Sequence, residues 1–407
     1  MIPMSAVNLS SIAGVSVLAG SEVVSNDPLP IFSREAMAFL SDVSAALLKN
    51  RTAKAFPDVV SFAYWCRKAN LVRQKEGYES GLSTFGTRLG RGLALHIAPS
   101  NVPVNFAFSY AFALLSGNAS IVRVPSKPFS QIGAILDAIR SCIDNHPAVL
   151  SRTAFVSYPS DGEGTLALSS AADVRVIWGG DATVTSIRGI QAMPRCLDVT
   201  FADRYSIAML DSQSVIEALD ADIERLARDF YNDTYLMDQN ACSSPQAILW
   251  LGDSRRVGTA QTRFWNAVHD YASDHYELQP AVVMDKYVQS CSDLARGSVA
   301  SERRPDGYLT VADMAPGQAL SPTMRGVGGY FYEKAIVSLS DVAESVTERY
   351  QTITYYGLDP EEIRDQVIEA GLRGIDRIVP VGSAMDIGLV WDGFDLISVM
   401  SRIVDAR

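Results

Sequence analysis

The stretch GLALHIAPSNVPVNFAFSYAFALLSGNASIVRV, residues 92–124, decides how this chain folds. It begins with a short apolar run, 92–98, and ends with another, 119–124, and the segment between them includes an apolar part long enough for a buried helix. Two short apolar runs joined by a helix are typical of a βαβ unit, whose parallel strands are buried on both faces. Proline, asparagine and glycine residues interrupt the stretch, so it is not expected to span a membrane.

The same alternation of strands and helices continues along the chain. Further expected strands lie at 153–158, 174–178 and 205–210. This pattern predicts an α/β protein with parallel sheets covered by helices. We place a domain boundary near Leu210, which gives a first domain at 1–210 and a second at 211–379, and we expect 380–407 to return to the first domain. The stretch 290–329 is the least regular part of the sequence.

Composition narrows the class of ligand. The 407 residues are 48% hydrophobic, enough for a large core, and the net charge of −11 repels polyanions. We therefore expect small-molecule ligands and no nucleic acid. The five cysteines form no C-x-x-C pair and the four histidines have no ligand spacing, which favours a reducing compartment and no metal site. No Lys or Arg precedes Arg34, so we expect no secretory signal, no membrane span and a cytoplasmic protein.

One cysteine differs from the other four in its surroundings. Cys242 lies in DQNACSSPQ, residues 238–246, a small and polar stretch that leads into the apolar run AILWL. A thiol on such a loop is open to a substrate carbonyl, so Cys242 is a candidate nucleophile, and the alternative is an ordinary loop cysteine. His96, by contrast, lies inside an apolar run and is expected to be a core residue.

Three other motifs follow predicted strands. In PSNVP, the amide of Asn101 is held between two prolines and is a candidate donor to a developing oxyanion, or else part of an Asx turn. Ser126 and Lys127 carry a hydroxyl and a cation that can bind a phosphate, or they form a solvated loop. Gly179 and Gly180 would let a ligand approach backbone N–H groups, and a tight turn explains them about as well.

Taken together, these motifs resemble the aldehyde dehydrogenase superfamily, and within it the LuxC-type acyl-CoA (fatty acid) reductases. The resemblance extends from about Gly92 to the C-terminus and depends on the order and spacing of its pieces. These are APSNVP at 98–103, SGNAS at 116–120, VPSK at 124–127, VIWGGD at 176–181, the Cys242 loop, YQT at 350–352, RIVPVG at 377–382 and WDGFDLI at 391–397. The resemblance implies an aldehyde dehydrogenase-like fold, with two Rossmann-type αβα domains and the active site between them.

Catalytic roles are also implied by the resemblance. Cys242 would be the nucleophile, and Asn101 would stabilise the oxyanion together with the backbone N–H of Cys242. Hydrolytic relatives carry a Glu that activates water, whereas the comparable stretch here, CLDVTFAD at 196–203, has none. Release of an acid by water should therefore be slow. If Asp198 or Asp203 took the place of that Glu, it would activate water to release the acid. Oxidation of an aldehyde would then be the alternative reaction.

The resemblance further implies a nicotinamide cofactor. Gly179 and Gly180 would lie near its nicotinamide end, and Ser126 and Lys127 near its adenosine ribose. NAD-preferring relatives commonly have an acidic residue at the position of Lys127, which binds the ribose 2′-hydroxyl. A cation suits a 2′-phosphate, so we expect NADPH. No Glu-x-Phe-Gly-Pro-like segment precedes Ala335, and no residue is assigned to the nicotinamide ribose.

The expected reaction is the NADPH-dependent reduction of an acyl-CoA, or of another acyl thioester, to the aldehyde through an acyl-cysteine. The alternatives are an aldehyde dehydrogenase working in the oxidative direction, a cysteine acyltransferase or thioesterase without redox chemistry, and a non-catalytic binding protein. Resemblance to the LuxC group implies an acyl-CoA or acyl-protein donor, fatty acid metabolism of the kind that feeds bioluminescence, an acyl-protein synthetase as a partner, and a homo-oligomer.

Overall fold

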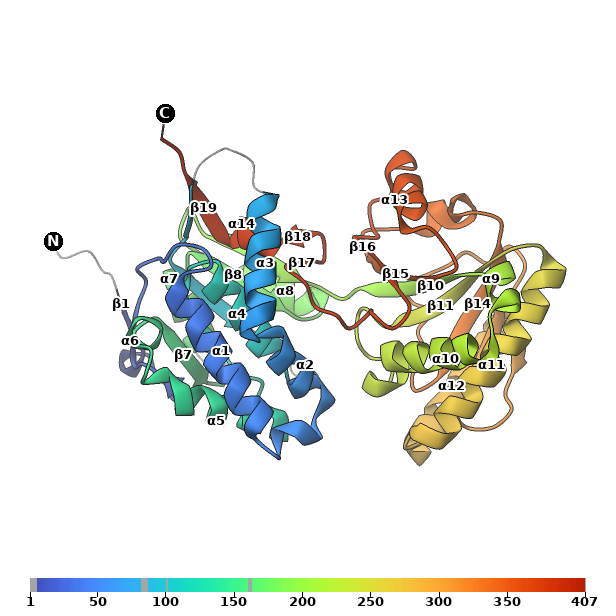
Figure 1. The fold of residues 1–407 in the computed structure, drawn as a ribbon, viewed down its shortest axis with the longest axis horizontal. Coiled ribbons are helices and arrows are strands. Elements are labelled where there is room, and N and C mark those ends of the chain that lie inside the picture. Colours follow the sequence, from blue (N-terminus) through green and yellow to red (C-terminus); the bar gives the residue numbers. More distant parts are fainter. Residues whose placement is uncertain (1–5, 82–86, 100–101, 160–162, 407) are drawn as a thin grey trace. The chain divides into compact units, whose positions relative to one another are not determined.

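The computed structural model describes residues 6–81, 87–99, 102–159 and 163–406 and divides the chain into two units (Figure 1). The first unit comprises Met1–Ala202 and Phe394–Arg407, and the second comprises Asp203–Gly393. Each unit has its own sheet and its own hydrophobic core. The α/β class expected from the sequence is confirmed.

The first unit is built on a six-stranded sheet with the order β2-β7-β6-β5-β8-β9. Its strands are β2 (Ser16–Gly20), β5 (Leu93–Ile97), β6 (Ala119–Arg123), β7 (Thr153–Ser157), β8 (Val174–Trp178) and β9 (Leu197–Phe201). All neighbouring pairs are parallel except β2 with β7. From β5 the chain builds β6 and β7 on one side and β8 and β9 on the other. Ligands of such sheets bind at the carboxyl ends of the strands where this order reverses, which here is between β5 and β8.

The stretch that decides the fold forms the centre of this unit. Strand β5 is buried along its whole length, and every residue from Phe106 to Leu115 of α4 (Asn105–Leu115) is buried, as expected for a helix that is apolar on all sides. Gly117 follows with φ of +83°, and a Cβ there would lie 1.9 Å from the carbonyl oxygen of Leu29, so only glycine fits.

Helices and short strands complete the first unit. The helices are α1 (Arg34–Lys49), α2 (Pro57–Trp65), α3 (Lys68–Ser80), α5 (Ser130–Ile143), α6 (Pro147–Leu150), α7 (Gly164–Ala171), α8 (Asp181–Arg188) and α14 (Leu396–Met400), with the 3₁₀ helices η1 (Leu9–Ser11) and η2 (Ala53–Ala55). The remaining strands are β1 (Ala6–Asn8), β3 (Val23–Ser25), β4 (Thr87–Gly90), β18 (Phe394–Asp395) and β19 (Ser401–Val404).

The second unit contains a seven-stranded sheet with the order β12-β13-β14-β11-β10-β15-β16. Its strands are β10 (Tyr205–Asp211), β11 (Pro245–Leu251), β12 (Val299–Arg303), β13 (Thr310–Met314), β14 (Tyr330–Ile336), β15 (Tyr350–Tyr356) and β16 (Arg377–Pro380), with β17 (Val390–Trp391) outside the sheet. The helices are α9 (Ser212–Glu217), α10 (Asp220–Thr234), α11 (Ser254–His275), α12 (Pro280–Arg296) and α13 (Pro360–Glu369), with η3 (Tyr235–Met237) and η4 (Leu339–Ser345). Only β12 is antiparallel to its neighbour.

The unit boundaries differ from those expected. Strand β10, placed in the first domain by the boundary at Leu210, pairs with β11 and β15, so the second unit begins at Asp203. The return to the first unit begins at Phe394 rather than at residue 380, because β16 pairs with β15. The returning segment is attached by β19, which pairs with β4, and by Asn118, whose side-chain amide donates to the Met400 carbonyl at 2.8 Å.

Candidate functional site

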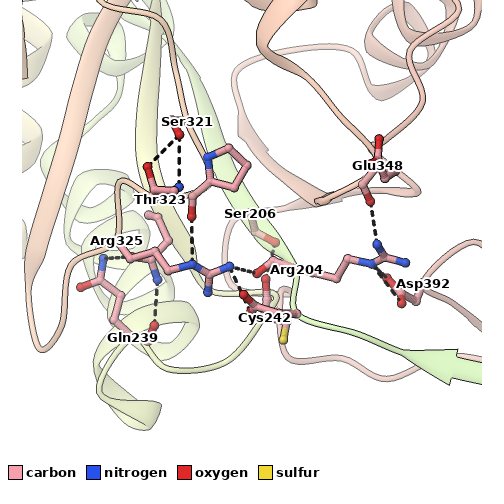
Figure 2. A network of polar contacts seen from close by, with 12 residues as sticks. Arg204, Ser206, Gln239, Cys242, Ser321, Thr323, Arg325, Glu348 and Asp392 are labelled. Atoms are coloured by element: carbon pink, nitrogen blue, oxygen red, sulfur yellow. Dashed lines mark hydrogen bonds and ion pairs between the residues drawn. The ribbon is translucent and has the colours of Figure 1, made fainter. Parts of the chain in front are cut away.

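Cys242 lies on a turn between η3 and β11. The turn spans Ala241 to Ser244, and the Ser244 N–H donates to the Ala241 carbonyl at 3.0 Å. In Figure 2, the hydroxyl of Ser206, at the start of β10, donates to the carbonyl of Cys242 at 2.7 Å. The cysteine side chain is half-buried. Two neighbouring strands of the sheet therefore hold the turn at their amino ends.

The backbone before this turn has an unusual conformation. Asp238 and Gln239 both have positive φ, 49° and 63°, although neither is glycine. The buried side chain of Gln239 donates to the Tyr330 carbonyl at 2.9 Å and accepts from the Gly329 N–H at 3.2 Å. The Gly328 N–H donates to the Asp238 carbonyl at 3.1 Å. The segment 328–330 thus fixes the two left-handed residues that lead to Cys242.

A buried lysine on α12 supports that segment in turn. The Lys286 ammonium donates to the carbonyls of Gly307 at 2.6 Å, Gly328 at 2.7 Å and Tyr308 at 3.3 Å. Its three protons therefore have three acceptors, while burial lowers the pKa of the lysine to about 8. Gly328 connects Lys286 to the backbone before the Cys242 turn. Its carbonyl accepts from Lys286, and its N–H donates to the Asp238 carbonyl.

The other side of the turn is held by α10 and by the loop after β16. Ser244 donates its hydroxyl to the Asp233 carbonyl at 2.7 Å, and the Asp233 carboxyl group accepts from the N–H groups of Gly382 at 2.6 Å and Ala384 at 2.9 Å. Burial raises the pKa of Asp233 to about 7, against the lowering effect of these bonds. Arg377 donates to the Ala384 carbonyl at 2.6 Å. The loop is therefore tied to the helix that precedes the turn.

Charged groups surround Cys242 in a chain of ion pairs (Figure 2). Arg325 donates to the Arg204 carbonyl at 2.6 Å and pairs with Asp203 at 3.1 Å. The guanidinium of Arg204 pairs with the buried Asp392 at 3.0 Å and donates to the Glu348 carbonyl at 2.7 Å. Three of these charges, those of Asp203, Arg325 and Asp392, act on the Cys242 thiol.

The net effect of this environment is a raised pKa for the Cys242 thiol. Burial is the largest cause, and the charges of Asp203 and Asp392 act in the same direction. The backbone N–H of Arg204 and the charge of Arg325 lower the pKa without offsetting the burial. Cys242 is therefore mainly in the thiol form at neutral pH.

A donor for an oxyanion is present next to the sulfur. Among the described residues, the backbone N–H of Cys242 has no hydrogen-bond acceptor. It is therefore free to bind a developing negative charge on a substrate oxygen. Asn101, the second donor expected from the sequence, lies outside the described residues.

The cofactor residues expected from the sequence lie at one edge of the first unit's sheet. Ser126 and Lys127 follow β6, Gly179 and Gly180 follow β8, and β5 lies between these two strands. Both side chains of the first pair are exposed, and a Cβ at Gly180 would meet no atom within 4 Å. The structure therefore brings the four residues to the carboxyl edge that contains the reversal point of the sheet.

The glycine pair is supported by buried aromatic and polar side chains. Trp178 stacks on Phe201 with ring centroids 3.8 Å apart and donates to the Ser109 hydroxyl at 3.1 Å. Ser109 also bonds Nδ1 of His96 at 2.7 Å. Burial lowers the pKa of His96 to about 3, so this histidine is a neutral core residue. The loop at Gly179 thus starts from a rigid strand end.

The two carboxylates that would substitute for the missing Glu belong to different units. Asp198 accepts two bonds from Arg175, at 2.6 and 2.8 Å, and is an ion-pair partner within the first unit. Asp203 belongs to the second unit and influences the Cys242 thiol directly.

Within residues 6–81, 87–99, 102–159 and 163–406, no group of three or more His, Cys, Asp or Glu side chains is placed to hold a metal ion. The same residues include no helix that is both long and apolar enough to cross a bilayer.

Sequence reasoning missed the residues that hold the Cys242 turn, namely Ser206, Asp233, Lys286 and Arg325. Lys286 gave a weak local signal, because it is one of only two charged residues in VVMDKYV, residues 282–288, and it faces inward. The other three hold the turn through groups that are distant in sequence, and no local pattern marks them.

We predict that Lys286→Met destabilises the second unit by about 3 kcal/mol, because three carbonyls lose their donor and buried unsatisfied polar groups cost about 1–3 kcal/mol each. Urea unfolding measures this loss. Lys334→Met is the matched control, since within the described part of the chain the Lys334 ammonium has a single acceptor, the Gln318 carbonyl at 3.1 Å. Equal losses in the two variants would contradict the role of Lys286.

We also predict that alkylation of Cys242 by iodoacetamide accelerates with pH and reaches half its maximal rate above the ordinary pKa of cysteine, because the thiolate is the reactive form. Asp203→Asn should move the midpoint to lower pH, since it removes a negative charge that opposes the thiolate. Mass spectrometry of the Cys242 peptide gives the rate.

Asp313→Asn serves as the control for this titration. Asp313 also pairs with an arginine, Arg303, but it does not contribute to the pKa of Cys242. A midpoint that Asp203→Asn leaves in place, or a wild-type midpoint at the value of a free cysteine, would refute this account of the thiol.

Known structures share the fold. The aldehyde dehydrogenase KauB from Pseudomonas aeruginosa superimposes with a TM-score of 0.63 at 11% identity, covering 91% of this chain and 83% of that chain. The NADP-dependent glyceraldehyde-3-phosphate dehydrogenase from Bacillus halodurans C-125, complexed with NADP, gives 0.58 at 15% identity, covering 90% and 85%. The aldehyde dehydrogenase-like fold is thereby confirmed.

Sequence comparison defines the group more narrowly. The long-chain acyl-protein thioester reductase of Aliivibrio fischeri is 23% identical over 310 residues, 73% of this chain and 61% of that protein. The corresponding protein of Vibrio harveyi is 27% identical over 303 residues, 72% of this chain and 59% of that protein. The matched region thus spans less than two thirds of these relatives. A model of the family described as acyl-CoA reductase (LuxC) matches residues 73–403, so the chain belongs to this family.

Proposed function

We propose that the protein reduces an acyl-CoA, or another acyl thioester, to the aldehyde with NADPH as the reductant, through an acyl group held covalently on Cys242. The arrangement around this residue supports the proposal: its sulfur is half-buried, its turn is fixed by hydrogen bonds on several sides, and its N–H is free. Membership of the LuxC family makes a thioester the expected substrate.

The first step takes place at the sulfur. The Cys242 thiolate attacks the carbonyl carbon of the thioester, and the C=O electron pair moves onto the oxygen. The free N–H of Cys242 stabilises this oxyanion, and we propose the Asn101 amide as the second donor. When the oxyanion collapses, the bond to the CoA sulfur breaks, and CoA leaves as a thiolate that takes up a proton. The acyl group remains on Cys242.

A bound reduced nicotinamide would supply two electrons as a hydride to the acyl carbon. The residues at the sheet edge fit such a cofactor. The Lys127 ammonium makes no hydrogen bond or ion pair within the described part of the chain, and Gly180 leaves open space beside the backbone. We propose that Lys127 and Ser126 bind the 2′-phosphoribose and that Gly179 and Gly180 lie along the nicotinamide end.

The final step returns Cys242 to its starting state. The Cys242 thiohemiacetal loses its C–S bond, its oxygen forms the aldehyde carbonyl, and the sulfur leaves as a thiolate. Overall, an acyl thioester, a hydride and a proton become an aldehyde and a free thiol. Hydrolysis of the acyl-cysteine should be slow, because Asp198 is engaged by Arg175.

The position of Asp203 supports a second candidate function, the release of an acid by hydrolysis. Its carboxylate lies near Cys242 and would activate water if Arg325 released it, giving an acid by the oxidative or the thioesterase route. Asp203→Asn separates the two functions: it would abolish acid formation by a hydrolytic enzyme and leave aldehyde formation by a reductase in place.

We further propose a cytoplasmic homo-oligomer that takes its acyl group from CoA or from a partner protein. The second source is suggested by the relatives, which are named long-chain acyl-protein thioester reductases. An acyl-protein synthetase would be the partner in that case. Mass spectrometry of the products formed from NADPH and a panel of acyl-CoAs tests the reaction itself.

We predict that radioactive acyl-CoA labels the protein in the absence of NADPH and that Cys242→Ala abolishes the label, because no other thiol occupies this turn. Addition of NADPH should release the label from the wild-type protein as aldehyde. Cys291→Ser is the control, since Cys291 is exposed on α12 and should not be needed. Label retained by Cys242→Ala would exclude the mechanism, and label lost equally fast without NADPH would indicate a thioesterase.

Lys127→Ala should raise the KM for NADPH roughly tenfold or more, since a hydrogen bond to a charged group contributes about 1.5–3 kcal/mol. The KM for NADH should change little, because NADH has no 2′-phosphate. Lys127→Arg keeps the cation and should keep the preference. Steady-state kinetics with both cofactors provides the comparison, and equal kcat/KM values for NADH and NADPH in the wild-type enzyme would contradict the proposed role.

A further inference from the structure

Three arginines of the first unit line a small cavity. Its volume is about 100 Å³, and it is lined by Arg91, Asp173, Arg195 and Arg402. Since a void of about 10–15 Å³ is enough for one water molecule, the cavity has room for a small polyatomic ion. Of the described residues that line it, Asp173 alone is acidic, so two positive charges are in excess. This excess contrasts with the net charge of −11 of the whole chain.

The cavity lies at the amino edge of the six-stranded sheet. Arg91 comes two residues before β5, Asp173 one residue before β8 and Arg195 two residues before β9, and these strands are parallel neighbours. Arg402 belongs to β19, in the segment that returns to the first unit, and is paired with Leu89 of β4. The cofactor residues expected from the sequence follow β6 and β8, at the carboxyl edge. The cavity is therefore separate from the proposed cofactor site.

Most of the guanidinium N–H groups at the cavity lack an acceptor. Arg91 donates from Nε to a main-chain carbonyl of the returning segment at 2.9 Å, and its two Nη atoms have no acceptor in the described ranges. Within the same ranges, the side chains of Arg195 and Arg402 make no hydrogen bond and no ion pair. Asp173 pairs with none of the three there, and its carboxylate accepts from the Leu93 N–H at 2.8 Å. The cavity thus presents charged donors that can bind a ligand.

The arginines repel one another. Burial lowers the pKa of Arg91, and the charges of Arg195, Arg88 and Arg402 lower it further. Arginine stays charged in proteins all the same, so this repulsion is present in the folded chain. An anion in the cavity would remove it by neutralising the arginines together.

The donors and the charge together indicate a phosphate group. Each guanidinium presents a planar fork of N–H donors that matches the oxygens of a phosphate. Three guanidinium groups can each bind a different oxygen of a phosphate, whereas a carboxylate offers only two oxygens. At neutral pH a phosphate group carries a charge of about −1.5 to −2, which would balance the two excess positive charges of the lining.

We propose that Arg91, Arg195 and Arg402 form a binding site for a phosphate group, carried either by free phosphate or by a small phosphomonoester. The proposal goes beyond the proposed function and does not depend on it. Arg402 lies on the returning segment, whereas Arg91 and Arg195 lie on the main part of the first unit, so the ligand connects the two. Binding should therefore hold β19, labelled near the C-terminus in Figure 1, against β4.

Calorimetric titration of the full chain with inorganic phosphate, at constant ionic strength in chloride, tests the site. We expect half-saturation at about 1 mM or below, with Arg195→Gln and Arg402→Gln each raising it about tenfold or more, since each removes a hydrogen bond to a charged group. Arg195→Glu should abolish binding. Arg51→Gln is the matched control, because Arg51 is exposed, belongs to the first unit and does not line the cavity. No binding by the wild type, or equal binding by Arg195→Glu and the control, would overturn the proposal.

A further variant separates this site from the proposed cofactor site. Lys127→Ala should leave the binding of inorganic phosphate unchanged, because Lys127 follows β6 at the other edge of the sheet. Binding that Lys127→Ala abolishes and Arg195→Glu retains would refute the proposal. Glycerol 3-phosphate then distinguishes the two sources of the phosphate group. If it competes with inorganic phosphate, the site accepts an ester, and if only inorganic phosphate binds, the site takes the free ion.

Hydrogen exchange locates the effect of binding and needs no activity. At ten times its half-saturating concentration, phosphate should slow amide exchange in β19 and β4 by up to about tenfold in the wild type, and not in Arg195→Glu. Helix α5, whose residues do not line the cavity, is the internal reference and should change less. Exchange in β19 that phosphate leaves unchanged, or slows no more than in α5, would contradict a ligand that connects the returning segment to the unit.

Discussion

Two successive left-handed residues, Asp238 and Gln239, determine how Cys242 is presented. For a side chain other than glycine, such a conformation costs on the order of 1–3 kcal/mol, so the surrounding structure has to hold it in place. The holding groups are the Gln239 side chain, the N–H groups of Gly328 and Gly329, and, behind them, the Lys286 ammonium. Without them the chain would relax toward an ordinary turn, and the free N–H of Cys242 would not be kept ready for an oxyanion.

This constraint explains the unusual inner face of α12. A lysine that must reach the Gly328 carbonyl has to enter the interior from the helix, and burial lowers its pKa as a result. Its neighbours on that face, Ser290 and Asp293, make hydrogen bonds rather than apolar contacts. Because a hydrogen bond contributes only about 1 kcal/mol net, α12 is attached with little of the hydrophobic stabilisation that usually holds a surface helix.

The sequence predicts the parts of this structure that depend on local patterns. The apolar runs at 92–98 and 119–124 became β5 and β6, because a strand buried on both faces is apolar throughout. The strand at 205–210 was also identified, but its domain was not, since membership depends on pairing with β11 and β15, which lie far along the chain. Cys242 was found from its polar neighbours, whereas Asp233 was missed because its partners at 382 and 384 are main-chain N–H groups. The irregular stretch at 290–329 contains β12 and β13, whose short sequences give weak periodicity.

Burial around Cys242 has two opposing consequences. It raises the pKa of the thiol and so reduces the amount of thiolate that would attack a substrate in the proposed mechanism. An acyl-cysteine, once formed, is uncharged, so the same burial does not destabilise it and limits the access of water to it. Arg325 and the Arg204 N–H recover part of the lost thiolate, and Asp203 and Asp392 keep the cations fixed at the expense of raising the pKa further. Burial of the sulfur would not help a hydrolase, because water has to reach its acyl intermediate. A reductase of the proposed mechanism would gain a longer-lived intermediate, so burial of the sulfur is consistent with the proposed reduction.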